Sequence, residues 1–247
     1  MMNDLDMLSS LAALGGSMEN VEMIEITSPD EVMENTQNLP EELPILPLRN
    51  TVLFPGIVIP VTVTRTKAIR LVKKAYKGDR TIGIISQVRQ TKDEPSFDDL
   101  YKIGTIGSIL KMIVLPDGNV TIILQGRRRF RVEEFVKEIP YITARVSYIE
   151  DFFPSQRKKE IKALVQSLKE AATQIMNLNI DLPRDAQTAI SNIENPSFLI
   201  HFLSSRLQSR LGIYVCNILI DQSHFLLFLI QRQSYYLFLM QIEVELL

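Results

Sequence analysis

The stretch ELPILPLRNTVLFPGIVIPV, residues 42–61, decides the fold that we expect for this chain. It is mostly apolar, four prolines interrupt it, and Arg49 is its only basic residue. Proline has no backbone N–H, so prolines at this spacing favour edge strands and turns over a central strand. The segment IVIPVTVTR alternates after Pro60 and is rich in β-branched residues, which predicts a strand. The stretch is therefore predicted to form the first strands of a β domain.

The residues that follow predict one helix and several further strands. In TKAIRLVKKAYKG the apolar residues recur at helical spacing, with Thr66 as the expected cap and Gly78 as the expected end. Strands are expected in TIGIISQV, on both sides of the turn LPDGNV, and in YITARVSYI. Within that turn, Asp117-Gly118 is a strong hairpin signal. Many short strands with one early helix predict a compact, mostly antiparallel β domain, either a barrel or a sandwich.

The chain changes character at Pro154. The segment SQRKKEIKALVQSLKEAATQIMNL places its apolar residues on one stripe, which predicts a long amphipathic helix. Pro183 can start a second helix, and in NPSFLIHFLSSRL we expect Asn195 as N-cap with Pro196 at the first helical position. The predicted fold class is α+β: a mostly antiparallel β domain followed by a bundle of at least three helices.

The net charge of the chain is only −2, but the charged residues are distributed unevenly along it. Residues 1–42 carry ten acids and no Lys or Arg, whereas residues 43–149 carry 18 basic and nine acidic residues, a net of +9. We interpret the first block as a mobile acidic leader, or as a tail that docks on its own basic domain. The single cysteine, Cys216, excludes an intramolecular disulfide, and no signal peptide is recognisable, so a cytoplasmic location is expected.

Three stretches together resemble a known family. They are LPILPLRNTVLFPGIVIPV, then DEPSFDDLYKIGTIGSILKMIVLPDGNVTIILQGRRRFRV, and later AISNIENPSFLIHFLSS. In order and spacing they look like the N-terminal region of Lon, the ATP-dependent protease, over about residues 43–205. The resemblance implies a PUA-like β domain at 43–150 and a helical subdomain at 151–205. It also implies recognition of unfolded or misfolded proteins in quality control, and a ring-shaped homo-oligomer in the full-length family.

The same resemblance indicates what this chain lacks. The full-length family uses ATP and Mg in an ATPase module and a Ser-Lys dyad in a protease domain. No G-x-x-x-x-G-K-[ST] motif occurs here, so no phosphate-binding loop is available. His201 and His224 do not form a metal cluster with Cys216, and a structural role is expected for His201 on its helix. We therefore expect no catalytic, cofactor-binding or metal-binding residues, and no enzyme activity of the chain by itself. A stand-alone binding module of the same kind is the alternative.

Two groups of residues are candidates for binding substrate. Leu53, Phe54 and Pro55 lie on a predicted loop and could offer an apolar surface, although Phe54 could equally belong to the core. In GRRRFR, strand alternation would place Arg127, Arg129 and Arg131 on one face, and Arg128 with Phe130 on the other. Basic residues beside an aromatic also suit RNA, since PUA-like folds often bind it. The acidic leader would compete with nucleic acid, so we favour a protein partner.

The last block, residues 206–247, departs from the family. Two apolar runs, 225–230 and 235–240, are each too short to span a bilayer, and Arg232 would lie near the centre of any joined span. We interpret this tail as the product of an altered reading frame or of a truncated gene. A partner-covered helical hairpin and a membrane anchor are the alternatives, and no membrane partner is expected.

Overall fold

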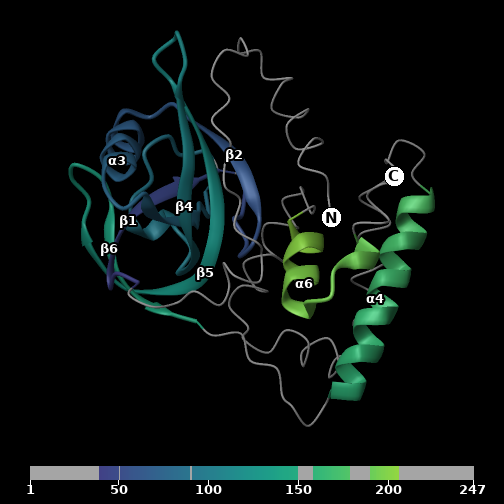
Figure 1. Ribbon diagram of the computed structural model, residues 1–247. Helices are drawn as coiled ribbons and strands as arrows, with labels where there is room; N and C mark the ends of the chain where they lie inside the picture. The colour runs from purple at the N-terminus through teal and green to yellow at the C-terminus, as the bar shows by residue number, and fades with distance from the viewer. Residues whose placement is uncertain (1–38, 50, 90, 150–157, 179–189, 206–247) are drawn as a thin grey trace.

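The computed structural model describes residues 39–49, 51–89, 91–149, 158–178 and 190–205 (Figure 1). The β domain comes first, and two helices follow it. Its elements are β1 (Glu42–Leu48), β2 (Val58–Val63), α3 (Thr66–Lys77), β3 (Thr81–Ser86), the 3₁₀ turn η1 (Phe97–Asp99), β4 (Ile103–Val114), β5 (Val120–Lys137) and β6 (Thr143–Tyr148). The helices are α4 (Lys158–Leu178) and α6 (Pro196–Ser204).

The strands form one sheet that closes on itself. The order is β2-β5-β4-β3-β1-β6, and β5 also pairs with β6, so the sheet is a barrel rather than a sandwich. Every pairing is antiparallel except that of β1 with β3. Strand β5 is long enough to pair with β2 through residues 120–125 and with β6 through residues 130–137. Since β4 occupies one edge of β5, β2 and β6 lie end to end along the other.

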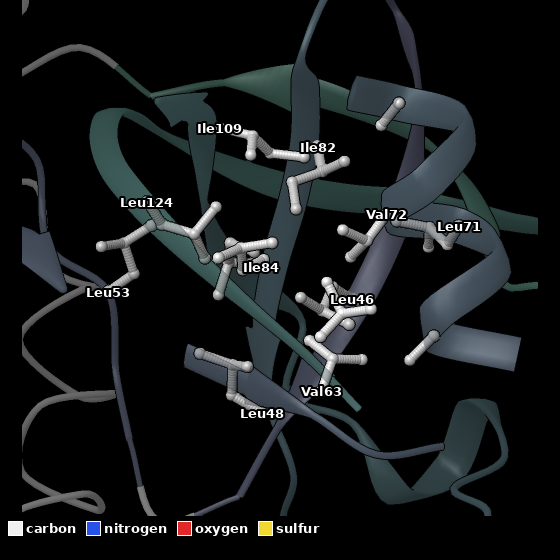
Figure 2. Packing of buried hydrophobic residues seen from close by; sticks show 14 residues of the cluster. Leu46, Leu48, Leu53, Val63, Leu71, Val72, Ile82, Ile84, Ile109 and Leu124 are labelled. Atoms are coloured by element: carbon white, nitrogen blue, oxygen red, sulfur yellow. The ribbon is translucent and has the colours of Figure 1, made fainter. Parts of the chain in front are cut away.

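Among the described residues of the barrel, two apolar clusters are large and a third, around Phe54 and Ile103, is small. In the first, Leu71 and Val72 of α3 pack with Leu46 of β1 and Ile82 of β3, as Figure 2 shows. The second surrounds Phe130, which is fully buried. The helical stripe of α3 thus covers the barrel in the way its 3.6-residue period predicts.

Local signals in the sequence are largely confirmed. Gly118 has φ 85° and donates its N–H to the carbonyl of Leu115, which makes the predicted hairpin turn. Helix α3 ends at Gly78, as expected, but the predicted cap is wrong by one residue. Thr66 is the first helical residue, and Arg65 occupies the N-cap without a side-chain hydrogen bond.

Helices α4 and α6 pack through a small apolar cluster, in which Ala172 of α4 and Leu199 of α6 meet Ile190 from a short helical turn before α6. Asn195 caps α6, because its Oδ1 accepts the N–H of Phe198 at 3.1 Å, as predicted. The helix expected from Pro183 lies outside the described residues, so the three-helix bundle stays a prediction. None of the helices in the described ranges is long and apolar enough to cross a bilayer.

The β domain begins slightly earlier than the predicted boundary at residue 43. Strand β1 starts at Glu42, and the carbonyl of Pro40 accepts a hydrogen bond from the hydroxyl of Tyr148 at 2.6 Å. The leader up to residue 38 and the tail from residue 206 lie outside the described residues.

Candidate functional site

The apolar candidates of the sequence, Leu53, Phe54 and Pro55, are buried. Leu53 and Phe54 are each 2% exposed. The N–H of Gly56 donates to the carbonyl of Gly126 at 2.9 Å, and a Cβ at Gly126 would lie 2.1 Å from the carbonyl oxygen of Phe54. The loop therefore lies backbone to backbone on β5 as part of the barrel wall. It is not the accessible surface that we expected from its position between strands.

The end of that loop also joins the barrel to the helices. The ring of Phe54 lies 5.8 Å from the ring of His201 on α6, measured between centroids. His201 is buried, as expected for a histidine with a structural role.

A β-bulge displaces one of the basic candidates, Arg127, whereas Arg128 to Arg131 keep the predicted alternation. Ile106 pairs with Arg128 whereas Gly107 pairs with Gly126, so Arg127 is an extra residue and strict alternation breaks there. Arg129 is 5% exposed and Phe130 is fully buried, while Arg127 is half-buried. The predicted basic ridge beside an accessible aromatic is therefore wrong. An aromatic inside the barrel cannot stack on a base, so the RNA alternative loses its main support.

A groove opens elsewhere in the barrel wall, between the end of β1 and the edge of β2. Its volume is about 270 Å³. Within the described residues, β1 pairs with β6 only through residues 42–44, and β2 pairs with β5 alone. The lining residues come from both strands and from the start of α3: Leu46, Pro47, Leu48, Arg49, Thr51, Pro60, Val61, Thr62, Val63, Thr64, Arg65 and Ala68.

Strand β2 turns alternate backbone groups toward this groove. The N–H of Gly126 on β5 donates to the carbonyl of Ile57 at 2.9 Å. In an antiparallel ladder only alternate residues bond to the same neighbour, so Val61 and Val63 bond to β5 as Ile57 does. Pro60 and Thr62 then direct their backbone groups away from β5. Pro60 has no N–H to give, so the groove edge of β2 offers the N–H of Thr62 and two carbonyls.

Strand β1 faces the groove in the same way. Ile45 donates its N–H toward β6, to the carbonyl of Ile142 at 2.8 Å, whereas the carbonyl of Leu48 accepts from Gln87 on the β3 side. Alternation therefore places the backbone groups of Pro47 on the groove side. Pro47 and Pro60 both lack a donor, so direct pairing of β1 with β2 would be short of hydrogen bonds. This explains why the wall stays open here.

The groove has an apolar floor and a polar rim. Its floor is made by Leu46, Leu48 and Val63, which are buried and converge in Figure 2. On the rim, Pro60 and Thr62 are exposed. Such a surface suits an extended chain, because the rim can bond to its backbone while its inward side chains rest on a floor that is itself only 2–6% exposed.

Cations of the rim hold the neighbouring loop. Arg49 forms an ion pair with Asp93 at 2.5 Å, and Arg65 donates to Oε1 of Gln87 at 2.5 Å. Nε2 of Gln87 in turn donates to the carbonyl of Lys92 at 3.1 Å. Burial, and secondarily the charge of Arg49, lowers the pKa of Arg65. With a neutral partner in Gln87, Arg65 leaves positive charge at the groove.

Asp99 anchors the far end of this loop. Its carboxylate accepts from Lys92 at 2.5 Å and from the backbone N–H and hydroxyl of Ser96, at 2.8 and 2.6 Å. The hydrogen bond from Lys92, followed by those from Ser96, holds the pKa of Asp99 well below its usual range.

A second apolar area lies on η1 and the far end of β5. The rings of Phe97 and Phe135 stack at 4.6 Å with 3° between their planes, and Nζ of Lys102 lies 4.7 Å from the Phe135 centroid. Near this strand end, Val136 is 36% and Ile139 78% exposed. These residues form a second surface on which a polypeptide substrate could bind.

The sequence candidates therefore missed both surfaces. A signal for the groove was present, because Pro47 and Pro60 are the prolines that mark unpaired edges. The periodicity of the sequence could not show that the edge of β1 with Pro47 faces the edge of β2 with Pro60.

Comparison with known proteins places this architecture. Residues 42–211 match the family described as the ATP-dependent protease La (LON) substrate-binding domain, and this range contains the whole groove. The chain is 55% identical over 194 residues to the Lon protease of Cytophaga hutchinsonii, covering 78% of this chain and 24% of that protein. It is 46% identical over 187 residues to the Lon protease of Flavobacterium johnsoniae, covering 75% and 23%. The chain thus spans about a quarter of the length of these curated relatives.

The fold agrees with these matches. The N-terminal domain of a Mycobacterium avium complex Lon protease superposes with a TM-score of 0.59 at 17% identity, covering 73% of this chain and 90% of that one. At that identity the likeness establishes a shared, mostly β fold. The matched region is the substrate-binding region and not the ATPase or protease domain. The chain belongs to the Lon substrate-binding domain family.

Proposed function

We propose that this chain recognises unfolded or misfolded polypeptide for a Lon-type ATP-dependent protease, and that the groove between β1 and β2 is its contact surface. The observation that carries the proposal is the groove itself, in which an unpaired strand edge lies over a closely packed apolar floor within a substrate-binding family. Unfolded chains differ from native ones in offering free backbone groups and apolar side chains together. The groove has a complement for each.

Other features of the proposal rest on membership of the family. They are a PUA-like topology of the barrel, a helical bundle after it, and a homo-oligomer in the full-length protein. The location is cytoplasmic, and the ATP and Mg of the full-length family act outside this chain. A role in protein quality control follows from the preference for unfolded chains.

The test is a binding titration with fluorescently labelled, reduced and carboxymethylated casein. Thr62→Lys places a charge on the free edge, where lysine opposes strand pairing. Val114→Lys adds the same charge on the β4–β5 hairpin, where Val114 is 56% exposed. We expect Thr62→Lys to weaken casein binding at least fivefold, about 1 kcal/mol, and Val114→Lys to leave it within about twofold. Equal losses in both variants would contradict the assignment of the groove.

A single-stranded RNA of mixed sequence serves as the competing ligand. We expect it to bind more weakly than casein at physiological salt, with an affinity that falls steeply as salt rises. RNA binding tighter than casein binding, and strengthened by Thr62→Lys but not by Val114→Lys, would make the groove a nucleic-acid site.

Catalysis by the chain alone is tested with the same material. Without a phosphate-binding loop, the purified chain should neither hydrolyse ATP nor degrade casein. Activity that disappears on substitution of a residue of this chain would refute this expectation.

A further inference from the structure

We propose that a bound polypeptide segment adds to β2 as an extra β-strand, which completes the barrel wall at the groove. This inference rests on the proposed function and specifies how the substrate is held. Its occupant is an extended segment of non-native protein, recognised mainly through its own backbone.

The free edge supplies the hydrogen bonds. Pro60 and Thr62 turn their backbone groups away from β5, so an incoming strand meets the N–H and C=O of Thr62 and the C=O of Pro60. From Pro60 to Val63 the groove edge of β2 is about 10 Å long at roughly 3.4 Å per residue. This length matches a strand of about four residues. Across the groove the carbonyl of Pro47 is a further acceptor.

The groove also selects among segments. Alternate side chains of an added strand point to the same face, so those directed inward lie over Leu46, Leu48 and Val63. An inward charge would be buried without a partner, and a proline would remove a backbone donor. We therefore infer a preference for short apolar, β-branched segments. Native proteins bury such segments, so this preference by itself separates unfolded from folded chains.

The charge of the rim fits an acidic group next to such a segment. Arg49 and Arg65 line this rim, and Lys67 follows Arg65 closely in the sequence. Arg49 forms an ion pair with Asp93, whereas Lys67 forms one with Glu94. Arg65 hydrogen-bonds the neutral amide of Gln87 instead. Asp93 and Glu94 also act on the charge of Arg65, but the three cations outnumber the two acids, so a carboxylate flanking the bound segment would meet a net positive rim.

The decisive experiment measures amide hydrogen exchange by NMR on the full chain, with and without reduced, carboxymethylated casein. In the free protein the amide of Thr62 should exchange much faster than those of Val61 and Val63, which bond to β5. Casein should slow exchange at Thr62 by at least tenfold while changing its neighbours little. An amide of Thr62 that is already protected in the free chain would overturn the proposal, since the edge would then be occupied.

Two variants complete the test. Thr62→Pro removes the edge N–H but no bond of the β2–β5 ladder, and should weaken casein binding roughly fivefold. Thr62→Val keeps the N–H, removes only the hydroxyl, and should bind casein within about twofold of the original chain. If Thr62→Lys abolishes binding while casein leaves the Thr62 amide unprotected, the groove binds substrate but strand addition is wrong. If Thr62→Lys has no effect, the proposed function of the groove itself fails.

Discussion

Replacing Phe54 by alanine separates a core residue from a substrate contact. Phe54 is 2% exposed and packs with Ile103 beside half-buried Val52 and Ile57. A buried Phe→Ala change costs about 3–5 kcal/mol, and more where the surroundings cannot collapse into the cavity. Here the loop is hydrogen-bonded to β5 at Gly56, which limits collapse, so we expect the upper half of that range.

The assay is thermal unfolding together with casein binding below the transition. At about 2–4 °C per kcal/mol, the melting temperature of Phe54→Ala should fall by roughly 8–20 °C. Casein affinity of the folded variant should stay within about twofold. Val88→Ala, at a residue that is 50% exposed, is the control and should change stability by less than about 0.5 kcal/mol. Lost casein binding with an unchanged melting temperature would refute this reasoning and restore Phe54 as a surface contact.

Three further predictions concern stability in urea. Gly126→Ala should lower the free energy of unfolding by about 1–3 kcal/mol, because the new Cβ would clash with the carbonyl of Phe54. Gly78→Ala should lower it far less, because a Cβ there would lie 3.6 Å from its nearest atom, the carbonyl oxygen of Ala75. The pKa of Asp99 is lower in the folded chain than in the unfolded chain, where it is near 4, so the ionised carboxylate stabilises the fold at pH values above about 4. The free energy of unfolding should therefore fall as the pH drops below about 4, and Asp99→Asn should reduce this fall. An unchanged pH dependence in Asp99→Asn would contradict the anchoring role of Asp99. Asn195→Ala removes the cap of α6 and should cost about 1 kcal/mol, and no loss would mean that α6 is held by packing alone.

The sequence alone predicted correctly those structural features that depend on a few neighbouring residues. The Asp117-Gly118 turn, the helical stripe of α3 and the Asn195 cap all follow from the preferences of a few neighbouring residues. The prolines of the opening stretch were likewise correct indicators of unpaired edges. Their spacing could not show that the edges containing Pro47 and Pro60 face each other, because this depends on how the barrel closes.

The candidate site could not be predicted for a similar reason. Phe54 is buried because Gly126, more than seventy residues later in the sequence, lets the two backbones approach closely. The bulge displaces only Arg127, whereas Arg128 to Arg131 alternate as predicted; Phe130 is buried because its face of β5 is the inside of the barrel. Long-range pairing, which no local period records, therefore decided which residues reach the surface.

Site-specific photo-crosslinking tests the central claim most directly. The crosslinking amino acid p-benzoylphenylalanine replaces exposed Pro60 at the groove in one protein, and Ile139, which is 78% exposed beyond the aromatic pair, in another. Each is irradiated with reduced, carboxymethylated casein, and the crosslinked fraction is measured. We expect strong crosslinking from position 60, competed by unlabelled casein, and little from position 139. Strong crosslinking from position 139 with none from position 60 would instead place the substrate on the Phe97–Phe135 surface and rule out the groove.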